Sequence, residues 1–142
     1  MHAYYRQPAI YKDQVVFIAE DDLWTFNLKD KVARRLTANL GMIRYPQFSP
    51  DGKQIAFTST EEGISEIYIM PSEGGEAKRL TYLGAYLYTL GWKGSKIIFA
   101  SSHSSFLRGY YKLYEIDREG GASVELPYGR ASDISFGEKG VV

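Results

Sequence analysis

The residues best suited to chemistry in this sequence are a histidine and four serines in one short run, Ser101-Ser102-His103-Ser104-Ser105. A serine hydroxyl beside an imidazole can act as the nucleophile and base of a hydrolase. Such an enzyme also needs an orienting acid, an oxyanion hole and a sharp nucleophile turn such as Gly-x-Ser-x-Gly, and the sequence carries no such motif. We therefore predict a polar loop between two strands, and no catalytic residue in this chain.

Three other features invite a metal or cofactor interpretation. Glu20-Asp21-Asp22 groups three carboxylates but lacks the alternating oxygen ligands and turn glycine of a calcium loop. The other histidine, His2, lies beside the N-terminus, so no histidine-based metal cluster can be drawn. Gly74-Gly75 and Gly120-Gly121 neither open a helix nor match a nucleotide-binding spacing, and we interpret them as hairpin turns. The sequence predicts no metal site and no cofactor-binding residue.

Basic pairs and single aromatic residues recur along the chain. Arg34-Arg35 and Lys78-Arg79 could form a track for peptide carboxylates, but their recurrence on an outer strand favours a solvated edge that discourages foreign strands. Trp24, Tyr68 and Tyr114 could line a cavity, but their matched positions favour packing between repeats. Substrate-binding residues remain unassigned.

The overall composition narrows the class of protein. Seventeen basic residues balance seventeen acidic ones, so neither a nucleic-acid footprint nor attraction to an anionic membrane is indicated. The absence of cysteine excludes disulfides and suits a reducing compartment. No apolar stretch has the character of a signal segment or the length of a membrane span. We expect a soluble, cytoplasmic protein without a nucleic-acid or membrane partner.

The elements that must position these residues are short strands. The repeated pattern, a hairpin of two strands, is clearest at residues 45–57, where two apolar runs flank a turn. In this turn Pro50 fixes φ, Asp51 can accept hydrogen bonds from nearby amides, and Gly52 takes a positive φ. Apolar runs near 66–70 and 76–81 supply two more strands, and four antiparallel strands in about forty residues form one propeller blade. The weakly helical pattern at 30–36 occupies a fourth-strand position, so we predict a strand there.

The unit repeats. Phe17, Phe57 and Phe99 follow one another at intervals of about forty residues, and their flanking turns and strands recur with them. The sequence predicts an all-β, partial propeller as one domain over residues 1–142. Its blades are expected in the following ranges: blade one at about 7–39, blade two at about 43–81, blade three at about 86–126 and the start of a fourth at about 131–142.

Within the last range, 131–136 is the expected first strand of the fourth blade. Three blades and a fraction cannot close a ring, so apolar faces would be left uncovered. We therefore expect either a segment of a longer chain or copies that associate to complete a ring.

Three stretches carry a resemblance to a known family: Asp21-Asp22-Leu23-Trp24, Leu36-Thr37-Ala38-Asn39-Leu40-Gly41 and Phe48-Ser49-Pro50-Asp51-Gly52-Lys53. In this order from residue one, they resemble the N-terminal β-propeller region of the tricorn protease family. The Ser-Pro-Asp-Gly-Lys unit alone is less specific, because it is similar to the WD40-like repeat of TolB and of prolyl-oligopeptidase relatives.

The resemblance implies that the parent is a large, cytoplasmic, oligomeric serine peptidase, a hydrolase that degrades short peptides released by the proteasome. Its first domain would be a six-bladed propeller, and its catalytic residues would lie in later domains. The expected function of this segment is then a non-catalytic channel, gate or scaffold, with the remaining propeller and catalytic domains, further copies and peptides as partners. Two alternatives remain open: a TolB-like protein-binding module and a self-associating half-propeller.

Overall fold

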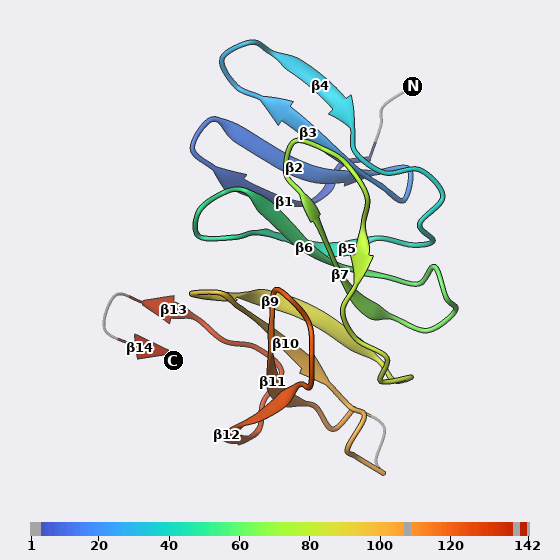
Figure 1. Ribbon diagram of the computed structural model, residues 1–142, viewed down its shortest axis with the longest axis vertical. Coiled ribbons are helices and arrows are strands. Elements are labelled where there is room, and N and C mark those ends of the chain that lie inside the picture. The colour runs from blue at the N-terminus through green and yellow to red at the C-terminus, as the bar shows by residue number, and fades with distance from the viewer. Residues whose placement is uncertain (1–3, 107–108, 138–139, 142) are drawn as a thin grey trace.

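The chain folds into three four-stranded antiparallel sheets followed by a two-stranded hairpin (Figure 1). The computed structural model describes residues 4–106, 109–137 and 140–141. Each sheet is built from four consecutive strands, and the sheets succeed one another along the longest axis of the molecule. The described residues form no helix, and therefore none of the length and apolarity that a membrane span requires. The expected all-β propeller segment of three blades with the start of a fourth is confirmed.

The strands have these bounds: blade 1, β1 Arg6–Tyr11, β2 Gln14–Ala19, β3 Asp22–Asn27 and β4 Val32–Arg35; blade 2, β5 Arg44–Phe48, β6 Gln54–Ser59, β7 Glu66–Pro71 and β8 Lys78–Arg79; blade 3, β9 Leu87–Lys93, β10 Lys96–Ser101, β11 Lys112–Asp117 and β12 Val124–Arg130; hairpin, β13 Phe136–Gly137 and β14 Gly140–Val141. The strand predicted within 30–36 is present as β4. The strand expected over 131–136 is wrong in extent, because only Phe136 of that range is in a strand, and its partner β14 is equally short.

The first hairpin of blade 2 turns as the sequence predicts. The Gly52 N–H donates to the Ser49 carbonyl oxygen at 2.8 Å, and Gly52 has a φ of +70°. The Asp51 carboxylate accepts hydrogen bonds from the Ser49 hydroxyl at 2.6 Å and from the Lys53 N–H at 3.1 Å. These donors, the hydroxyl first, lower the pKa of Asp51 to about 2. The turn is therefore fixed both by backbone conformation and by a charged side chain.

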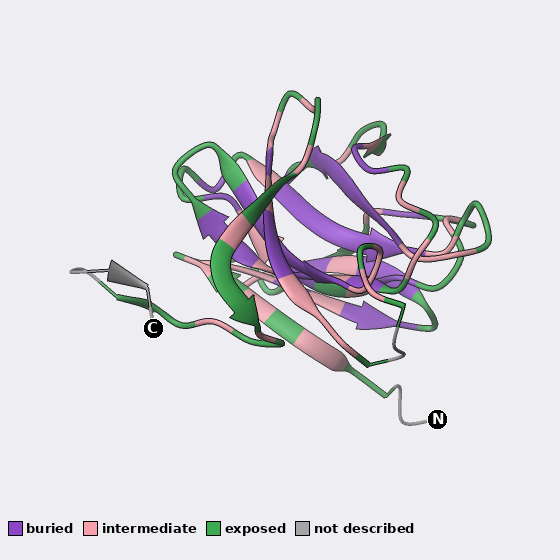
Figure 2. Ribbon diagram, turned by 90° about the horizontal axis from the view of Figure 1, so that it is seen from below, coloured by how far each residue is buried: buried purple, intermediate pink, exposed green. Residues whose placement is uncertain are grey.

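The core lies between the blades (Figure 2). Each blade carries two cross-strand pairs from its second and third strands that form an apolar row: Val15–Phe26 and Phe17–Trp24 in blade 1, Ile55–Met70 and Phe57–Tyr68 in blade 2, Ile97–Ile116 and Phe99–Tyr114 in blade 3. The row of blade 2 packs on the Val16, Ile18 and Leu23 side chains of blade 1, and the row of blade 3 packs on Ala56, Ile67 and Ile69 of blade 2. Tyr68 and Tyr114 therefore pack between blades, as predicted.

In the part of the chain that the structure describes, no blade covers the corresponding row of blade 1. All members of the rows in blades 2 and 3 are buried, whereas Val15, Phe17, Trp24 and Phe26 are only half-buried. The Tyr5 ring packs edge-on against Phe17, with their ring centroids 5.1 Å apart. We call these four residues the blade 1 row. Its side chains pair in the same register as the interface rows of blades 2 and 3, but they are less buried than those rows.

Candidate functional site

The structure places the His103 loop between β10 and β11, as the sequence predicts. The imidazole Nδ1 of His103 lies 3.0 Å from the hydroxyl of Ser101, and the ring packs on Tyr114 at 4.4 Å between centroids. Ser101 is completely buried, so a substrate cannot reach its hydroxyl. The hydroxyl of Ser104 lies 2.6 Å from that of Tyr114. Burial lowers the pKa of His103. These contacts are those of a packed loop.

The acidic cluster at 20–22 is divided between two structural ion pairs. Asp21 accepts from Arg6 at 2.6 Å, and Asp22 accepts from Arg35. Within the described ranges no three histidine, cysteine or acidic side chains come together as a metal site would require. His2 lies outside the described residues. That the chain has no metal, cofactor or catalytic residue stays a prediction.

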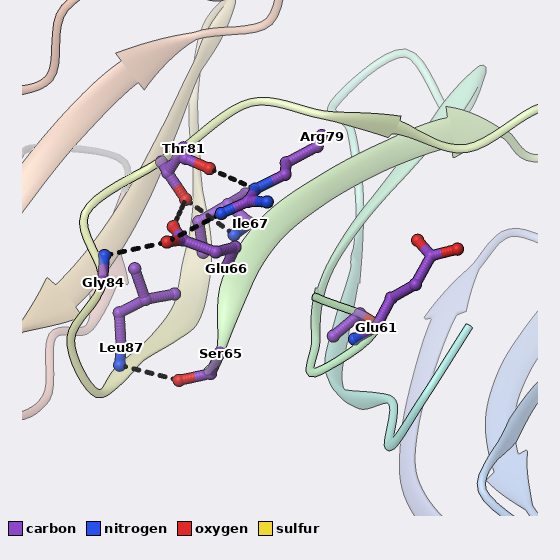
Figure 3. A network of polar contacts seen from close by, with 9 residues as sticks. Glu61, Ser65, Glu66, Ile67, Arg79, Thr81, Gly84 and Leu87 are labelled. Atoms are coloured by element: carbon purple, nitrogen blue, oxygen red, sulfur yellow. Dashed lines mark hydrogen bonds and ion pairs between the residues drawn. The ribbon is translucent and has the colours of Figure 1, made fainter. Parts of the chain in front are cut away.

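Blade 2 holds a buried carboxylate with a complete set of donors (Figure 3). Glu66, at the start of β7, is fully buried and accepts from the Thr81 hydroxyl at 2.5 Å, from the Arg79 guanidinium at 3.2 Å and from the Gly84 N–H at 2.9 Å. The Thr81 hydroxyl oxygen in turn accepts the N–H of Ile67 at 2.9 Å. Burial of a charge is tolerated when it is paired and hydrogen-bonded in this way. This cluster ties β7 to the end of β8 and to the linker that leads into blade 3.

The same arrangement recurs in blade 1. Asp22 accepts from Arg35 and from the Thr37 hydroxyl, the latter at 3.0 Å, and that hydroxyl oxygen accepts the N–H of Leu23 at 2.9 Å. In blade 3 the charges are exchanged, since Lys112 lies at the acidic position and pairs with Glu125 at 2.7 Å. These pairs explain why arginine follows the third strand at a fixed interval.

The other basic residue of each pair reaches the next blade. Arg34 contacts Glu73, in the β7–β8 turn, at 3.3 Å, and Lys78 donates to the carbonyl oxygen of Glu119, in the β11–β12 turn, at 2.9 Å. Arg118 further joins Asp51 at 3.2 Å. β4 and β8 are the outermost strands of their sheets, as expected, and their basic side chains also link strands and neighbouring blades.

A groove of about 510 Å³ lies between blades 2 and 3, at the end of the sheets where the β6–β7 turn and the linkers between blades lie. It is lined by Met42, Arg44, Tyr45, Thr58, Thr60, Gly63, Ile64, Ser65, Tyr86, Leu87, Tyr88 and Tyr111. The rings of Tyr45 and Tyr88 are 5.3 Å apart and those of Tyr88 and Tyr111 are 5.4 Å apart. Ser65 closes one side by accepting the Leu87 N–H at 3.1 Å (Figure 3). A groove of this size, with aromatic walls, is suited to a small ligand or a peptide segment.

The backbone of Tyr45 is strained at the wall of this groove. Its φ is +53°, a left-handed conformation that bulky residues rarely adopt. Both neighbouring blades hold it, because the Gln7 side-chain oxygen accepts the Tyr45 N–H at 2.8 Å and the Thr89 hydroxyl donates to the Tyr45 carbonyl oxygen at 2.7 Å. The strain accompanies a bulge in β5, between Arg44 and Gln47. Gln7 has a φ of +49° at the equivalent bulge of β1, so the left-handed residue recurs in blades 1 and 2.

Sequence reasoning did not find this groove. Its walls come from three segments that are distant in the sequence, at 42–45, 58–65 and 86–88, and from Tyr111. No local sequence pattern predicts the left-handed backbone conformation of Tyr45. A signal did exist for the carboxylate clusters, since both Asp22 and Glu66 precede their arginine by 13 residues and their threonine by 15.

Comparison with known proteins agrees with this architecture. Residues 2–142 match the model of the tricorn protease N-terminal beta propeller domain. The chain is 37% identical over 139 residues to tricorn protease homolog 1 of Streptomyces coelicolor, covering 95% of this chain and 13% of that protein. It is 32% identical over 143 residues to the tricorn protease of Thermoplasma acidophilum, again covering 13% of the relative.

A shorter relative and a solved structure extend the comparison. A tricorn-like protease N-terminal subunit of Sulfurisphaera tokodaii is 32% identical over 143 residues, which cover 96% of this chain and 72% of that protein. The crystal structure of the tricorn protease superposes with a TM-score of 0.87 at 27% identity, over 97% of this chain and 15% of that one. TolB from Acinetobacter baumannii shares the fold, with a TM-score of 0.73 at 22% identity. The chain belongs to the tricorn protease N-terminal β-propeller family.

Proposed function

We propose that this chain is the non-catalytic N-terminal propeller segment of a tricorn-type serine peptidase that degrades short peptides. The observation that supports this most strongly is the superposition on the tricorn protease over 97% of the chain. The buried Ser101 and the packed His103 loop agree with a segment that positions other domains and carries out no hydrolysis itself. Residues 1–142 would form one partial propeller domain.

In this proposal the segment forms part of a channel or gate for peptides and a scaffold for the catalytic domains. The uncovered blade 1 row supports a partner that is itself a propeller blade. The remaining domains could follow on the same chain or come from a separate subunit, as the name of the Sulfurisphaera tokodaii relative suggests. The proposal also includes further copies of the assembly. It places the protein in the cytoplasm, because the short peptides released by the proteasome are produced there.

The experiment compares peptide hydrolysis by the purified 142-residue chain with hydrolysis by the chain together with its catalytic domains. The isolated chain should release no more product than buffer, and the complete protein should hydrolyse the same peptides until a serine-reactive fluorophosphonate inhibits it. Hydrolysis by the isolated chain that persists through repurification, or none by the complete protein, would overturn the proposal.

A further inference from the structure

We propose that the groove between blades 2 and 3 binds short peptides that place an aromatic or large aliphatic side chain beside a carboxylate. The choice of a peptide rests on the proposed function, whereas the aromatic and anionic selectivity comes from the side chains of the groove.

Arg44 brings a positive charge to the wall of the groove. Arg6 and Arg44 have the same register in blades 1 and 2, because they pair with Ile18 and Thr58, each one residue after the matched phenylalanine. Arg6 is neutralised by Asp21 at 2.6 Å. Among the described residues the Arg44 guanidinium meets no carboxylate, and it donates only to the sulfur of Met42, from Nη2 at 2.9 Å and from Nε at 3.2 Å. A thioether is a weak acceptor, so a carboxylate that entered the groove would be a better partner.

An apolar, largely aromatic surface lies beside that charge. Met42, Tyr45 and Tyr86 line the groove and are 40%, 37% and 68% exposed. Tyr88 is fixed between Tyr45 and Tyr111, and its hydroxyl donates to the Ser132 carbonyl oxygen at 2.7 Å. Burial between these rings raises the pKa of Tyr88. Rigid aromatic walls bind apolar side chains with little loss of conformational entropy.

The backbone of Tyr45 is held from both neighbouring blades. The bond from Gln7 and the bond from Thr89 hold a conformation that a tyrosine would not adopt on its own. Packing of the core does not require this ring, since 37% of the residue stays exposed. The same left-handed φ occurs at Gln7, which is +49° at the equivalent bulge of β1, so it is a feature of the repeat. At this position in blade 2 it places a tyrosine ring at the wall of the groove beside Arg44.

The test is a titration calorimetry series on the purified chain. Two acidic peptides distinguish the two possible sources of the ligand's carboxylate. Acetyl-Gly-Phe has a free terminal carboxylate, and acetyl-Phe-Glu-amide has a side-chain carboxylate. Acetyl-Gly-Phe-amide and acetyl-Phe-Gln-amide are their neutral counterparts. At least one acid should bind, and Arg44→Met should weaken it about tenfold, the effect of losing one charge-assisted hydrogen bond. The matched Arg6→Met should leave binding unchanged, because the Arg6 charge is already neutralised by Asp21.

A second variant separates binding from folding. Tyr45→Asn keeps a side chain that tolerates left-handed backbone but removes the ring, so it should weaken acid binding without lowering the unfolding temperature. Saturable binding of neither acid, equally tight binding of the amides, or equal losses from Arg6→Met and Arg44→Met would overturn the inference. If the binding test fails in one of these ways but the complete protein hydrolyses peptides, the proposed function stands and the proposed site is wrong. If the acids bind as expected but the complete protein hydrolyses no peptide, the proposed function is wrong and the site stands.

Discussion

At the scale of the residue, Thr81 has an unusually demanding position. Its hydroxyl donates to the buried Glu66 carboxylate and accepts the Ile67 N–H, so one oxygen atom satisfies a buried charge and a buried backbone donor. A bond to a charged partner contributes more than a neutral one, and an unsatisfied buried group costs its full desolvation. The threonine is therefore a stronger determinant of stability than its size suggests.

Thr81→Val keeps the shape of the side chain and removes both bonds. We expect the free energy of unfolding to fall by about 2 kcal/mol, as for other buried groups that lose a partner. Urea denaturation followed by circular dichroism measures this change.

Thr25→Val is the matched control. Thr25 is equally buried, but its hydroxyl makes no hydrogen bond within the described part of the chain. This substitution should change stability little or raise it, because it exchanges a hydroxyl for a methyl group at an interface between blades. Equal losses from both substitutions would show that the Glu66 cluster contributes nothing specific.

Asp51 gives the turn between β5 and β6 a dependence on pH. Its folded pKa of about 2 lies below the ordinary value near 4, so its contribution to stability is fully present above that ordinary value and is lost as the pH falls from about 4 to about 2. The difference in unfolding free energy between the wild type and Asp51→Asn should therefore shrink across this window. A difference that stays constant from about pH 5 to about pH 2 would contradict the assignment.

At the scale of the element, the first hairpin turns of blades 2 and 3 provide a matched pair of glycines. Gly52 and Gly94 have φ values of +70° and +60°. A Cβ on Gly52 would lie 2.0 Å from the Tyr11 ring of blade 1, whereas a Cβ on Gly94 would meet open space. Gly94→Ala should cost about 1 kcal/mol from backbone strain alone.

Gly52→Ala should cost clearly more than Gly94→Ala, because the Tyr11 ring must also leave its contact with Phe48, where the centroids are 6.0 Å apart. Thermal unfolding of both variants measures the difference. Equal losses would mean that the Tyr11 ring moves freely and that this contact between blades is weak.

The repeat made the elements predictable. Turn residues such as Pro50, Asp51 and Gly52 act locally, and the alternation of apolar residues fixes which face of a strand is buried, so the three sheets and the 30–36 strand could be derived from the sequence. The contacts of Arg34 and Lys78 with the next blade could not, because they depend on how far one sheet is rotated from the next. The groove escaped prediction for the same reason: its Tyr45 conformation depends on Gln7 and Thr89, which lie in the two neighbouring blades.

At the scale of the whole molecule, the sheets are joined through side chains and not by exchange of strands. Each described blade contains four consecutive strands, and blade 2 covers one face of blade 1, so a further blade beside blade 1 would pack on the blade 1 row. The indole N–H of Trp24, in this row, is buried and has no hydrogen-bond partner among the described residues. The equivalent rows in blades 2 and 3 are covered by aliphatic side chains of the preceding blade. We therefore expect another propeller blade as the partner of this face.

The solution mass of the chain, measured by light scattering over a concentration series, tests whether the blade 1 row is an interface between blades. With the blade 1 row uncovered, the mass should rise above the 16.1 kDa of one chain as the concentration increases. Phe17→Glu, which places a charge in the row, should remain folded by circular dichroism and return the mass to that of one chain. A wild-type mass of one chain at every concentration, or association that the charge leaves unchanged, would contradict the account of this face as an interface between blades.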